Sequence, residues 1–348
     1  MNQDHHSWRI LSDDKAFVRV NADICTHENR YVFIAGGRDH SRSVVVLDTK
    51  TGVIKNLIGL PQPYHKCSIT VAGKYLYIIS CFEDRPIYRK LICRANQSIE
   101  EPWEEVKGEG QLPQYRTLMS DGQHLFSFGH RGNAIYNTST ECWLSLPFMK
   151  KITFIFATVR LKQKLVVIGG YTNDYYFDRN NLIGEIWDNG SSKWHVLPGF
   201  ILDLENVDAA SFKNRWIIVT GKETGKSTFS FYIYDTKYEV LKKSPFSCTF
   251  ETEHVLTTIV EESLIIIGNL SATTTVKSIP LAYIFSNWII IEHLITLRSM
   301  VEKNRVIVNE ESLNLNALVR NLMINVDQDM FREIVSFLIP SLKYRRKE

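Results

Sequence analysis

The sequence of 348 residues lacks an apolar run long enough to form a membrane-spanning helix. Such a helix needs about 20 predominantly apolar residues. The most apolar region, residues 281–297, is shorter and contains Ser286, Asn287, Glu292 and His293. We therefore predict two strands joined by a turn at Ser286 and Asn287, and no membrane span. The polar N-terminus also lacks the apolar stretch of a secretory signal.

The six cysteines lack the spacing of a zinc site, because no two of them are separated by two residues and none has a histidine nearby at ligand spacing. We expect reduced cysteines, as is usual in the cytoplasm, and no cofactor. A large excess of charge is also missing, since 41 basic and 38 acidic residues give a net charge of +3. This charge is too small to predict a nucleic-acid partner. The one dense basic run, residues 343–347, indicates either a solvated end or a nuclear address.

What the chain does contain is a repeat. Short apolar runs, each preceded by a polar turn, end six times at a position that is usually glycine, and these positions are 40 to 52 residues apart. They are Gly36, Ser80, Gly129, Gly169, Gly221 and Gly268. Runs of four to six β-branched and aromatic residues between turns are typical of strands buried on both faces. A repeat of this length is typical of a β-propeller blade.

Four of the units also carry a later pair of large apolar residues, seven positions apart, and a proline follows in five units. The pairs are Leu47 and Ile54, Tyr136 and Trp143, Trp187 and Trp194, and Tyr234 and Leu241. The prolines are Pro61, Pro113, Pro147, Pro198 and Pro245. Proline cannot donate a hydrogen bond to a neighbouring strand, so we expect it to end the outer strand. Each unit thus predicts four strands.

Together the units resemble the kelch family of β-propellers. The fourth unit carries the family signature best, with the sequence KLVVIGG at residues 164–170 followed by Trp187 and Trp194 in the two aromatic positions. The first unit has both glycines but Ile54 where a tryptophan is expected, and the other units have lost one or both glycines. The resemblance covers roughly residues 8–310. It implies an all-β propeller of four-stranded blades around a central channel, and no particular chemistry.

Ring closure leaves two alternatives. Residues 8–11 (WRIL) are similar to an outer strand although they precede the first unit, so we expect them to pair with a blade from the other end of the chain. In the favoured alternative, residues 294–326 supply the rest of a split seventh blade. In the other, six blades close near Trp288. We assign the propeller to residues 8–311, with a possible extension to 326, and a helical and basic tail to residues 312–348.

Motifs that would indicate an enzyme are weak. The sequence GKETGKS at residues 221–227 is similar to a phosphate-binding loop, but it is one residue short and is followed by a predicted strand instead of a helix. Galactose oxidase, a copper enzyme, shares the kelch type of propeller, yet no motif of its copper site can be matched here. The histidines are scattered over different units. We therefore expect a protein without catalytic or metal-binding residues.

Binding of a partner protein is the function that the resemblance favours. Loops held on a rigid frame commonly carry recognition, and arginine and tyrosine are common anchors of protein interfaces. The loops after the glycine positions and between units are rich in both. The candidate interaction residues are Arg38, His40, Arg42, Arg85, Tyr115, Arg116, His130, Arg131, Tyr171, Tyr175, Tyr176, Arg179 and Lys222.

Two other functions stay open. Residues 327–338 loosely resemble the first helix of an F-box, which would make the protein a ubiquitin-ligase substrate adaptor, whereas an ordinary amphipathic helix explains the same pattern. A propeller enzyme is the second alternative. It predicts two or more histidine, tyrosine or carboxylate side chains that meet in the channel with shifted pKa values. A scaffold predicts arginine and tyrosine at one mouth of the channel instead.

Overall fold

The computed structural model describes sixteen segments of the chain. They are residues 9–12, 21–37, 41–81, 87–92, 102–106, 114–130, 132–152, 154–170, 172–173, 176–177, 182–188, 191–223, 225–226, 228–249, 255–270 and 273–285. The chain forms two compact units, Met1–Ile279 and Pro280–Glu348. In the second unit, the described part is one helical turn, α1 (Leu281–Ile284), closed by a hydrogen bond from the Phe285 N–H to the Leu281 carbonyl. No helix in the described segments is long and apolar enough to span a membrane.

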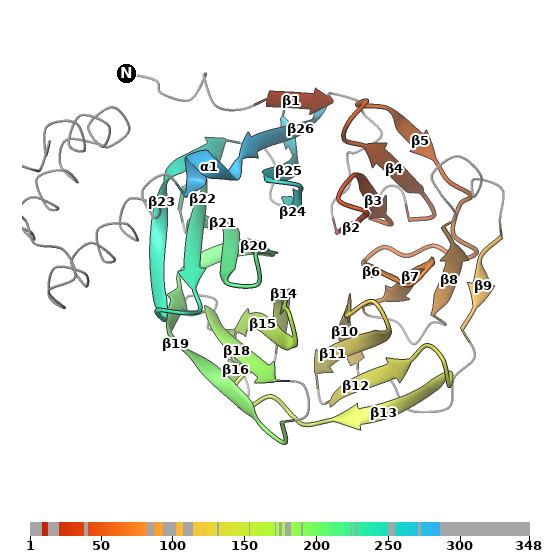
Figure 1. The fold of residues 1–348 in the computed structure, drawn as a ribbon, viewed down its shortest axis with the longest axis horizontal. Coiled ribbons are helices and arrows are strands. Elements are labelled where there is room, and N and C mark those ends of the chain that lie inside the picture. The colour runs from red at the N-terminus through yellow and green to blue at the C-terminus, as the bar shows by residue number, and fades with distance from the viewer. Residues whose placement is uncertain are drawn as a thin grey trace, which may run out of the picture. The chain divides into compact units, whose positions relative to one another are not determined.

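The first unit is a β-propeller of six four-stranded antiparallel blades (Figure 1). Blade 1 contains β2 (Asp23–His27), β3 (Tyr31–Ala35), β4 (Val44–Asp48) and β5 (Ile54–Asn56), and blade 2 contains β6 (Cys67–Ala72), β7 (Tyr75–Ser80), β8 (Tyr88–Leu91) and β9 (Glu104–Glu105). Blade 3 contains β10 (Gln114–Ser120), β11 (His124–His130), β12 (Gly132–Asn137) and β13 (Cys142–Leu146).

Blade 4 contains β14 (Phe154–Leu161), β15 (Lys164–Gly170), β18 (Leu182–Asp188) and β19 (Trp194–Leu202). A small hairpin, β16 (Thr172–Asn173) with β17 (Tyr176–Phe177), lies between β15 and β18 in the sequence. Blade 5 contains β20 (Leu204–Phe212), β21 (Trp216–Glu223), β22 (Thr228–Asp235) and β23 (Val240–Thr249). Blade 6 contains β24 (Leu256–Val260), β25 (Ser263–Leu270), β26 (Thr273–Pro280) and, as its outermost strand, β1 (Arg9–Ser12).

The N-terminal strand closes the ring, as predicted, but it does so in a sixth blade. β1 pairs antiparallel with β26, with Arg9 opposite Ser278, and the inner strand β24 contacts the inner strand β2 of blade 1. The prediction of seven blades was therefore wrong. The sixth unit supplies only three strands before residue 281, so the N-terminal strand completes this blade and no gap is left for another one.

Two other local predictions need correction. Residues 281–284, predicted as a strand, form α1 directly after Pro280, whose fixed φ suits the start of a helix. Proline does not end the outer strand in blades 4 and 5, because β19 and β23 continue through Pro198 and Pro245 with a register shift. Both are edge strands, where a missing N–H is tolerated. The predicted strands and tail beyond Phe285 lie outside the described residues.

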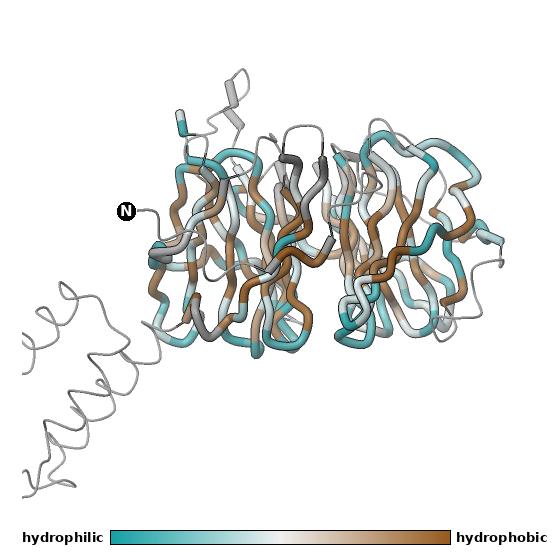
Figure 2. Tube along the Cα trace, turned by 90° about the horizontal axis from the view of Figure 1, so that it is seen from above, coloured by the Kyte–Doolittle hydropathy of each residue, from teal (hydrophilic) through white to brown (hydrophobic). Residues whose placement is uncertain are grey.

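Apolar side chains fill the space between neighbouring blades, and Figure 2 shows the strands of the ring mostly brown with teal turns at their ends. Phe33 and Leu76 belong to the cluster between blades 1 and 2, and Val166 and Ile217 to the one between blades 4 and 5. Close approach explains the first glycine position. A Cβ on Gly36 would lie 2.6 Å from Cys67 Sγ of the next blade.

The recurring aromatic and proline positions form contacts between blades. Trp194 of blade 4 donates from its indole N–H to the carbonyl of Pro147 of blade 3 at 2.9 Å. Tyr234 of blade 5 donates from its hydroxyl to the carbonyl of Pro198 of blade 4 at 2.8 Å. Each aromatic side chain therefore satisfies the carbonyl of the recurring proline in the preceding blade.

A buried carboxylate holds the connection from blade 3 to blade 4. Glu185 of β18 has no exposed surface. It accepts hydrogen bonds from the backbone N–H groups of Lys150, Lys151 and Ile152 at 2.6 to 2.8 Å. These charge-assisted bonds compensate the loss of water around the carboxylate, and so they account for its position inside the protein.

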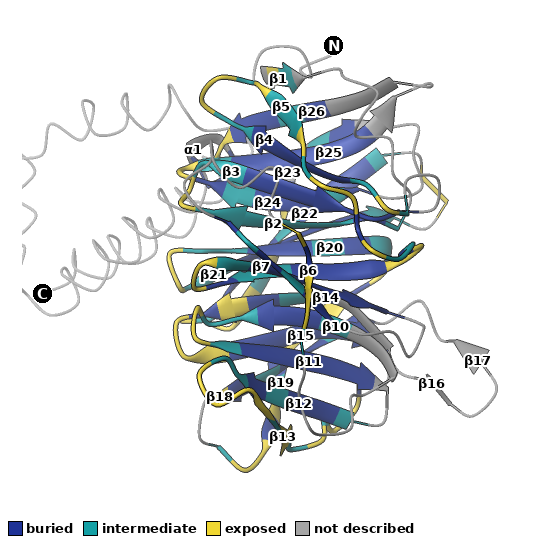
Figure 3. Cartoon of the chain, turned by 90° about the vertical axis from the view of Figure 1, so that its right-hand side faces the viewer, coloured by how far each residue is buried: buried dark blue, intermediate teal, exposed yellow. Residues whose placement is uncertain are grey.

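The antiparallel strand order gives the ring two different faces. The turn from the first to the second strand of each blade, and in blades 1 to 5 the turn from the third to the fourth strand, lie at one face, which we call the turn face. The connections from the second to the third strand and from blade to blade lie at the opposite face, which we call the loop face. The turn-face hairpins are mostly exposed, as the yellow segments in Figure 3 show.

Candidate functional site

The structure describes the side chains of two of the predicted interaction residues, and both lie toward the loop face. Arg42 is exposed before β4, and Lys222 is half-buried in β21 opposite Phe229. Four more have a described backbone within strands: Tyr115 and Arg116 in β10, His130 in β11 and Tyr176 in β17. Lys222 and these four were predicted in loops, so their assignment to loops was wrong. The strands extend further toward the loop face than the apolar runs indicate.

The remaining seven predicted residues lie outside the described residues: Arg38, His40, Arg85, Arg131, Tyr171, Tyr175 and Arg179. Their convergence at one mouth of the channel therefore stays a prediction.

A described polar cluster on the loop face of blade 5 centres on Glu223. Its carboxylate accepts hydrogen bonds from Lys226 and Lys243, and from the Ser230 hydroxyl at 2.8 Å. The hydrogen bond from Lys226, followed by that from Lys243, lowers the pKa of Glu223 to about 2. This cluster ties together the ends of β21, β22 and β23. Residues 228–235 form strand β22, as predicted, so the nearby GKETGKS sequence lacks the helix that a phosphate-binding loop requires.

The inner strands carry a chain of hydrogen bonds from blade to blade. Asp23 of β2 accepts from the N–H of its neighbour Ile24 at 2.8 Å and from the N–H of Ile69 in β6 at 2.7 Å. The Ser68 hydroxyl donates to Asp23 at 2.7 Å, and the same oxygen accepts from the Leu118 N–H of β10 at 2.9 Å. Three consecutive inner strands are thereby connected.

Asp208 of β20 repeats the pattern of Asp23 between blades 5 and 6. It accepts from the N–H of Ala209 at 2.8 Å and from the N–H of Thr257 in β24 at 2.6 Å. Its cross-strand neighbour is Thr220, whose side chain is fully buried. Asp23 and Asp208 occupy the same position in their strands, opposite the residue that precedes the glycine position.

Both carboxyl groups have raised pKa values. Loss of solvation raises the pKa of Asp208 to about 7, and the nearby charge of Asp23 adds to the effect. Loss of solvation also raises the pKa of Asp23, although the hydrogen bonds from Ser68 and from Ile69 oppose it. Both residues nevertheless keep part of their surface accessible. Of these two interacting carboxyl groups, Asp208 can therefore exchange its proton near neutral pH.

Sequence reasoning missed these two aspartates because it searched for known motifs. The signal that would have found them is positional. Asp23 precedes Gly36 by 13 residues, and Asp208 precedes Gly221 by the same number. The equivalent residues of the other blades are Ser68, Thr117, Ala157 and Leu256, so the acidic pair is confined to blades 1 and 5. Among the described residues, no three histidine, cysteine or acidic side chains are grouped closely enough to hold a metal ion.

On the turn face, blades 1 and 5 share a second feature, which we call the hairpin clasp. In blade 1, Arg30 binds both carboxylate oxygens of Asp48, at 2.8 and 2.6 Å, and Thr49 donates to the Arg30 carbonyl. In blade 5, Arg215 binds Asp235 in the same way, and Thr236 donates to the Arg215 carbonyl. Each clasp joins the first turn of its blade to the second.

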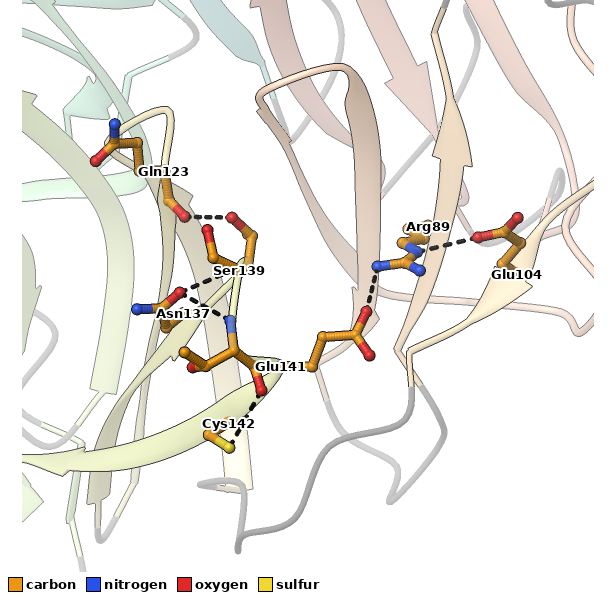
Figure 4. A network of polar contacts seen from close by, with 9 residues as sticks. Arg89, Glu104, Gln123, Asn137, Ser139, Glu141 and Cys142 are labelled. Atoms are coloured by element: carbon orange, nitrogen blue, oxygen red, sulfur yellow. Dashed lines mark hydrogen bonds and ion pairs between the residues drawn. The ribbon is translucent and has the colours of Figure 1, made fainter.

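The turn face of blades 2 and 3 is held by a different ion pair, shown in Figure 4. Arg89 of β8 binds Glu104 of β9 at 3.1 Å and Glu141, in the last turn of blade 3, at 2.9 Å. Its guanidinium also lies 4.9 Å from the centre of the Tyr75 ring. The positive charge of Arg89 is thus shared between two carboxylates of neighbouring blades.

No protein-family model and no curated protein matches the chain. Among solved structures, the chain is similar to the one described as "Structure of YjhT", with a TM-score of 0.53 and 12% sequence identity. The similarity covers 75% of this chain and 94% of that chain. At this identity the similarity shows a shared β-propeller fold. Membership of the kelch family remains a prediction from the repeats.

Proposed function

We propose that this protein is a non-catalytic, kelch-type interaction scaffold that binds a segment of a partner protein on its loop face. The observation that carries the proposal is the contrast between the two faces of the ring. Turns of neighbouring blades bind one another on the turn face, where the Gly73 N–H donates to the Gly122 carbonyl at 2.9 Å and the Lys162 N–H donates to Asn214 at 2.8 Å.

The turns between the first two strands have two or three residues in every blade, whereas the connections from the second to the third strand differ widely in length. Residues 36–43 join β3 to β4, residues 224–227 join β21 to β22, and a single residue separates β11 from β12. Loops of variable length on a rigid frame commonly carry recognition. Arginine binds carboxylates with two parallel hydrogen bonds, so the predicted arginines favour an acidic segment as the partner.

Affinity capture from the native cells tests this proposal. We expect a triple variant, Arg38→Glu with Arg85→Glu and Arg131→Glu, to lose proteins that the unmodified chain retains. The matched control is Lys50→Glu, which reverses an exposed charge of blade 1 on the opposite face. A triple variant that folds and still captures every partner would refute the loop-face proposal.

A second candidate function is chemistry or ligand binding in the central channel, favoured by Asp23 and Asp208. A carboxyl group with a pKa near 7 can both accept and donate a proton at physiological pH. The test is a thermal-shift screen of hydroxyl-bearing small molecules against the unmodified chain and Asp208→Asn. We expect a channel ligand to stabilise only the unmodified chain. If no compound distinguishes the two proteins, this candidate is excluded.

The ligase-adaptor alternative rests on residues 327–338, which lie outside the described residues. We propose a cytoplasmic location, with a nuclear address in residues 343–347 as the alternative. Capture with a copy truncated after residue 311 tests the adaptor function. Loss of ligase components from a folded truncated copy supports it, and their absence from both copies excludes it.

A further inference from the structure

Blades 4 and 5 concentrate positive charge on the turn face. Seven basic side chains against three carboxylates give an excess of four positive charges at the described strand ends and turns of these two blades. The basic residues are Arg160, Lys162, Lys164, Lys193, Lys213, Arg215 and Lys237. The carboxylates are Asp188, Asp235 and Glu239. The first turn of the adjacent blade 6 instead carries Glu261 and Glu262.

The internal ion pairs of this region use only part of that charge. Lys164 lies 3.5 Å from Asp188, and Arg215 is bound to Asp235. Within the described part of the chain, Lys162, Lys193 and Lys237 form no ion pair. Lys213 lies 3.2 Å from Glu262, but both side chains are more than half exposed, so this pair contributes little and can be exchanged for another partner.

Aromatic rings lie among these cations in blade 5. Phe212 and Trp216 stack with their centres 5.9 Å apart. Lys213 lies 4.8 Å from the centre of the Phe212 ring, and Lys237 lies 4.9 Å from that of Tyr238.

Arg215 is placed between two of the rings, 4.5 Å from the centre of Trp216 and 5.1 Å from that of Tyr238. Tyr238 is 38% exposed, and Val240 beside it is 36% exposed. The surface therefore combines positive charge with accessible apolar area.

Blade 1 shows that the hairpin clasp does not require Phe212, Lys213 and Tyr238, although it keeps an aromatic ring, Tyr31, 5.1 Å from Arg30. It contains the same arginine, aspartate and threonine, but the positions of Phe212, Lys213, Trp216 and Tyr238 are occupied by other residues. These are His27, Glu28, Tyr31 and Thr51. Because the simpler turn supports the same clasp, the additional side chains of blade 5 call for another explanation.

We propose that the turn face of blades 4 and 5 is a docking surface for a short acidic peptide segment with an aromatic or aliphatic residue beside its carboxylates. The unpaired lysines provide charge complementarity, and Tyr238 with Val240 provides an apolar contact next to them. This surface lies opposite the loop face, so the inference stands independently of the loop-face proposal.

The surroundings favour a short peptide over a nucleic acid. Glu261 and Glu262 directly border Lys213, so a long polyanion that followed the ring would meet negative charge in blade 6. Phe212 and Trp216 already stack on each other and lie against Lys213 and Arg215, and these contacts would compete with the stacking of bases.

Fluorescence anisotropy with the full chain tests the proposal. The probe is a labelled heptapeptide of glutamate and aspartate with one central phenylalanine. Its counterpart has lysine in place of every acidic residue, and a ten-nucleotide oligothymidylate represents nucleic acid. We expect the acidic peptide to bind at low salt and to be released as the salt concentration rises, because exposed charges are screened. The lysine peptide should not bind.

Matched variants locate the binding. Lys213→Glu combined with Lys237→Glu should weaken acidic-peptide binding about tenfold, since two attractive contacts become repulsive. Tyr238→Ala should weaken it by a smaller factor. The control is Lys50→Glu in blade 1, the counterpart of Lys237, which should leave binding unchanged, as should the loop-face triple variant. All of these side chains except the loop-face arginines are described and exposed, so the variants are expected to fold.

Three results would overturn the inference. The first is no binding of the acidic peptide to the unmodified chain, and the second is equal binding to the double variant. The third is tighter binding of the oligothymidylate through the same lysines, which would replace the peptide by a nucleic acid as the partner. Loss of partners by the loop-face variant, with unchanged binding of the acidic peptide, would separate the two proposals.

Discussion

Blades 1 and 5 share the same two polar features, but the side chains of the clasp are more buried in blade 5. Each has an aspartate on its inner strand and an arginine–aspartate clasp on its turn face. In blade 1, the side chains of Arg30 and Asp48 are 35% and 18% exposed. In blade 5, Arg215 is 19% exposed and Asp235 is fully buried. The same hairpin sequence can therefore form either a surface ion pair or a largely buried one, and the size of the neighbouring side chains decides which.

The pKa values of Asp48 and Asp235 are lowered in different ways because their burial differs. The hydrogen bond from Arg30 lowers the pKa of Asp48 to about 2. Burial by itself would raise the pKa of Asp235, but the hydrogen bonds from Arg215 and from the Lys237 N–H, together with the positive charge of Arg215, lower it. Asp235 therefore depends on its arginine more than Asp48 does, since no water is available to replace the guanidinium.

The largest effect is expected from removal of the clasp carboxylates. Asp235→Ala should lower the free energy of unfolding by about 3 kcal/mol, because it leaves Arg215 partly buried without a partner. Asp48→Ala should cost about 1 kcal/mol, because Arg30 is accessible to water. Urea denaturation of the two variants measures the difference.

A double variant, Arg215→Ala with Asp235→Ala, serves as the control for this prediction. It should be less destabilised than the sum of the single variants, since it leaves no uncompensated charge. An equal loss of unfolding free energy in Asp235→Ala and Asp48→Ala would show that burial by Trp216 and Tyr238 does not affect the stability of the clasp.

The inner-strand aspartates give the next largest effect, and it depends on pH. The pKa of Asp208 rises from 3.8 to about 7 in the folded protein, so the folded state holds this proton more tightly than the unfolded chain. The resulting stabilisation is complete below pH 3.8 and is lost as the pH rises through about 7. Asp208 alone contributes a slope of at most about 1.4 kcal/mol per pH unit in this range. Asp208→Asn should remove that slope in urea titrations between pH 5 and pH 8.

A second variant sharpens the comparison with Asp23. Blade 6 carries Leu256 where blade 2 carries Ser68, whose hydroxyl donates to Asp23. Leu256→Ser should place a donor next to Asp208 and lower its pKa, which would move the loss of stability to lower pH. An unchanged pH profile in Asp208→Asn would mean that another group is responsible for it.

The smallest effect concerns the aromatic position of the third strand. Tyr234 of blade 5 is buried and donates to the Pro198 carbonyl, whereas blade 1 has Leu47 at this position and no such bond. Tyr234→Phe should cost about 1 kcal/mol, the usual net value of one hydrogen bond. Tyr232→Phe is the control, because its hydroxyl lies at the long distance of 3.4 Å from Glu223 and should cost less. Thermal unfolding of the two variants provides the measurement, and equal costs would contradict the role of the Pro198 carbonyl.

Part of the fold could be read from the sequence because it depends on local patterns. Apolar runs ending at Gly36 and Gly169, the aromatic pair Trp187 and Trp194, and the N-terminal run at residues 8–11 all indicated strands that the structure contains. The number of blades could not be read in this way. It depends on which strand fills the edge of the last blade, and pairing between residue 9 and residue 278 leaves no local signal.

The candidate site shows the same limit. The candidate interaction residues were predicted in loops from their arginine and tyrosine content. Several of them belong to strands in the structure. Asp23 and Asp208 were not predicted, because a single aspartate in a strand matches no known sequence motif. Their pKa values depend on burial and on donors from the next blade, such as Ile69 and Thr257.

The sequence by itself determined that this protein is a ring of β-blades. Turn-forming residues, apolar periodicity and the recurring glycine and aromatic positions act over a few residues and repeat in every unit. Only the tertiary structure decided that the ring closes at six blades, that the charge of Asp23 helps to raise the pKa of Asp208, and that the lysines of blades 4 and 5 lie on the same face as the exposed ring of Tyr238. The physical reason is that closure, solvation of a carboxylate and surface charge all depend on residues far apart in the chain that meet only when the blades assemble.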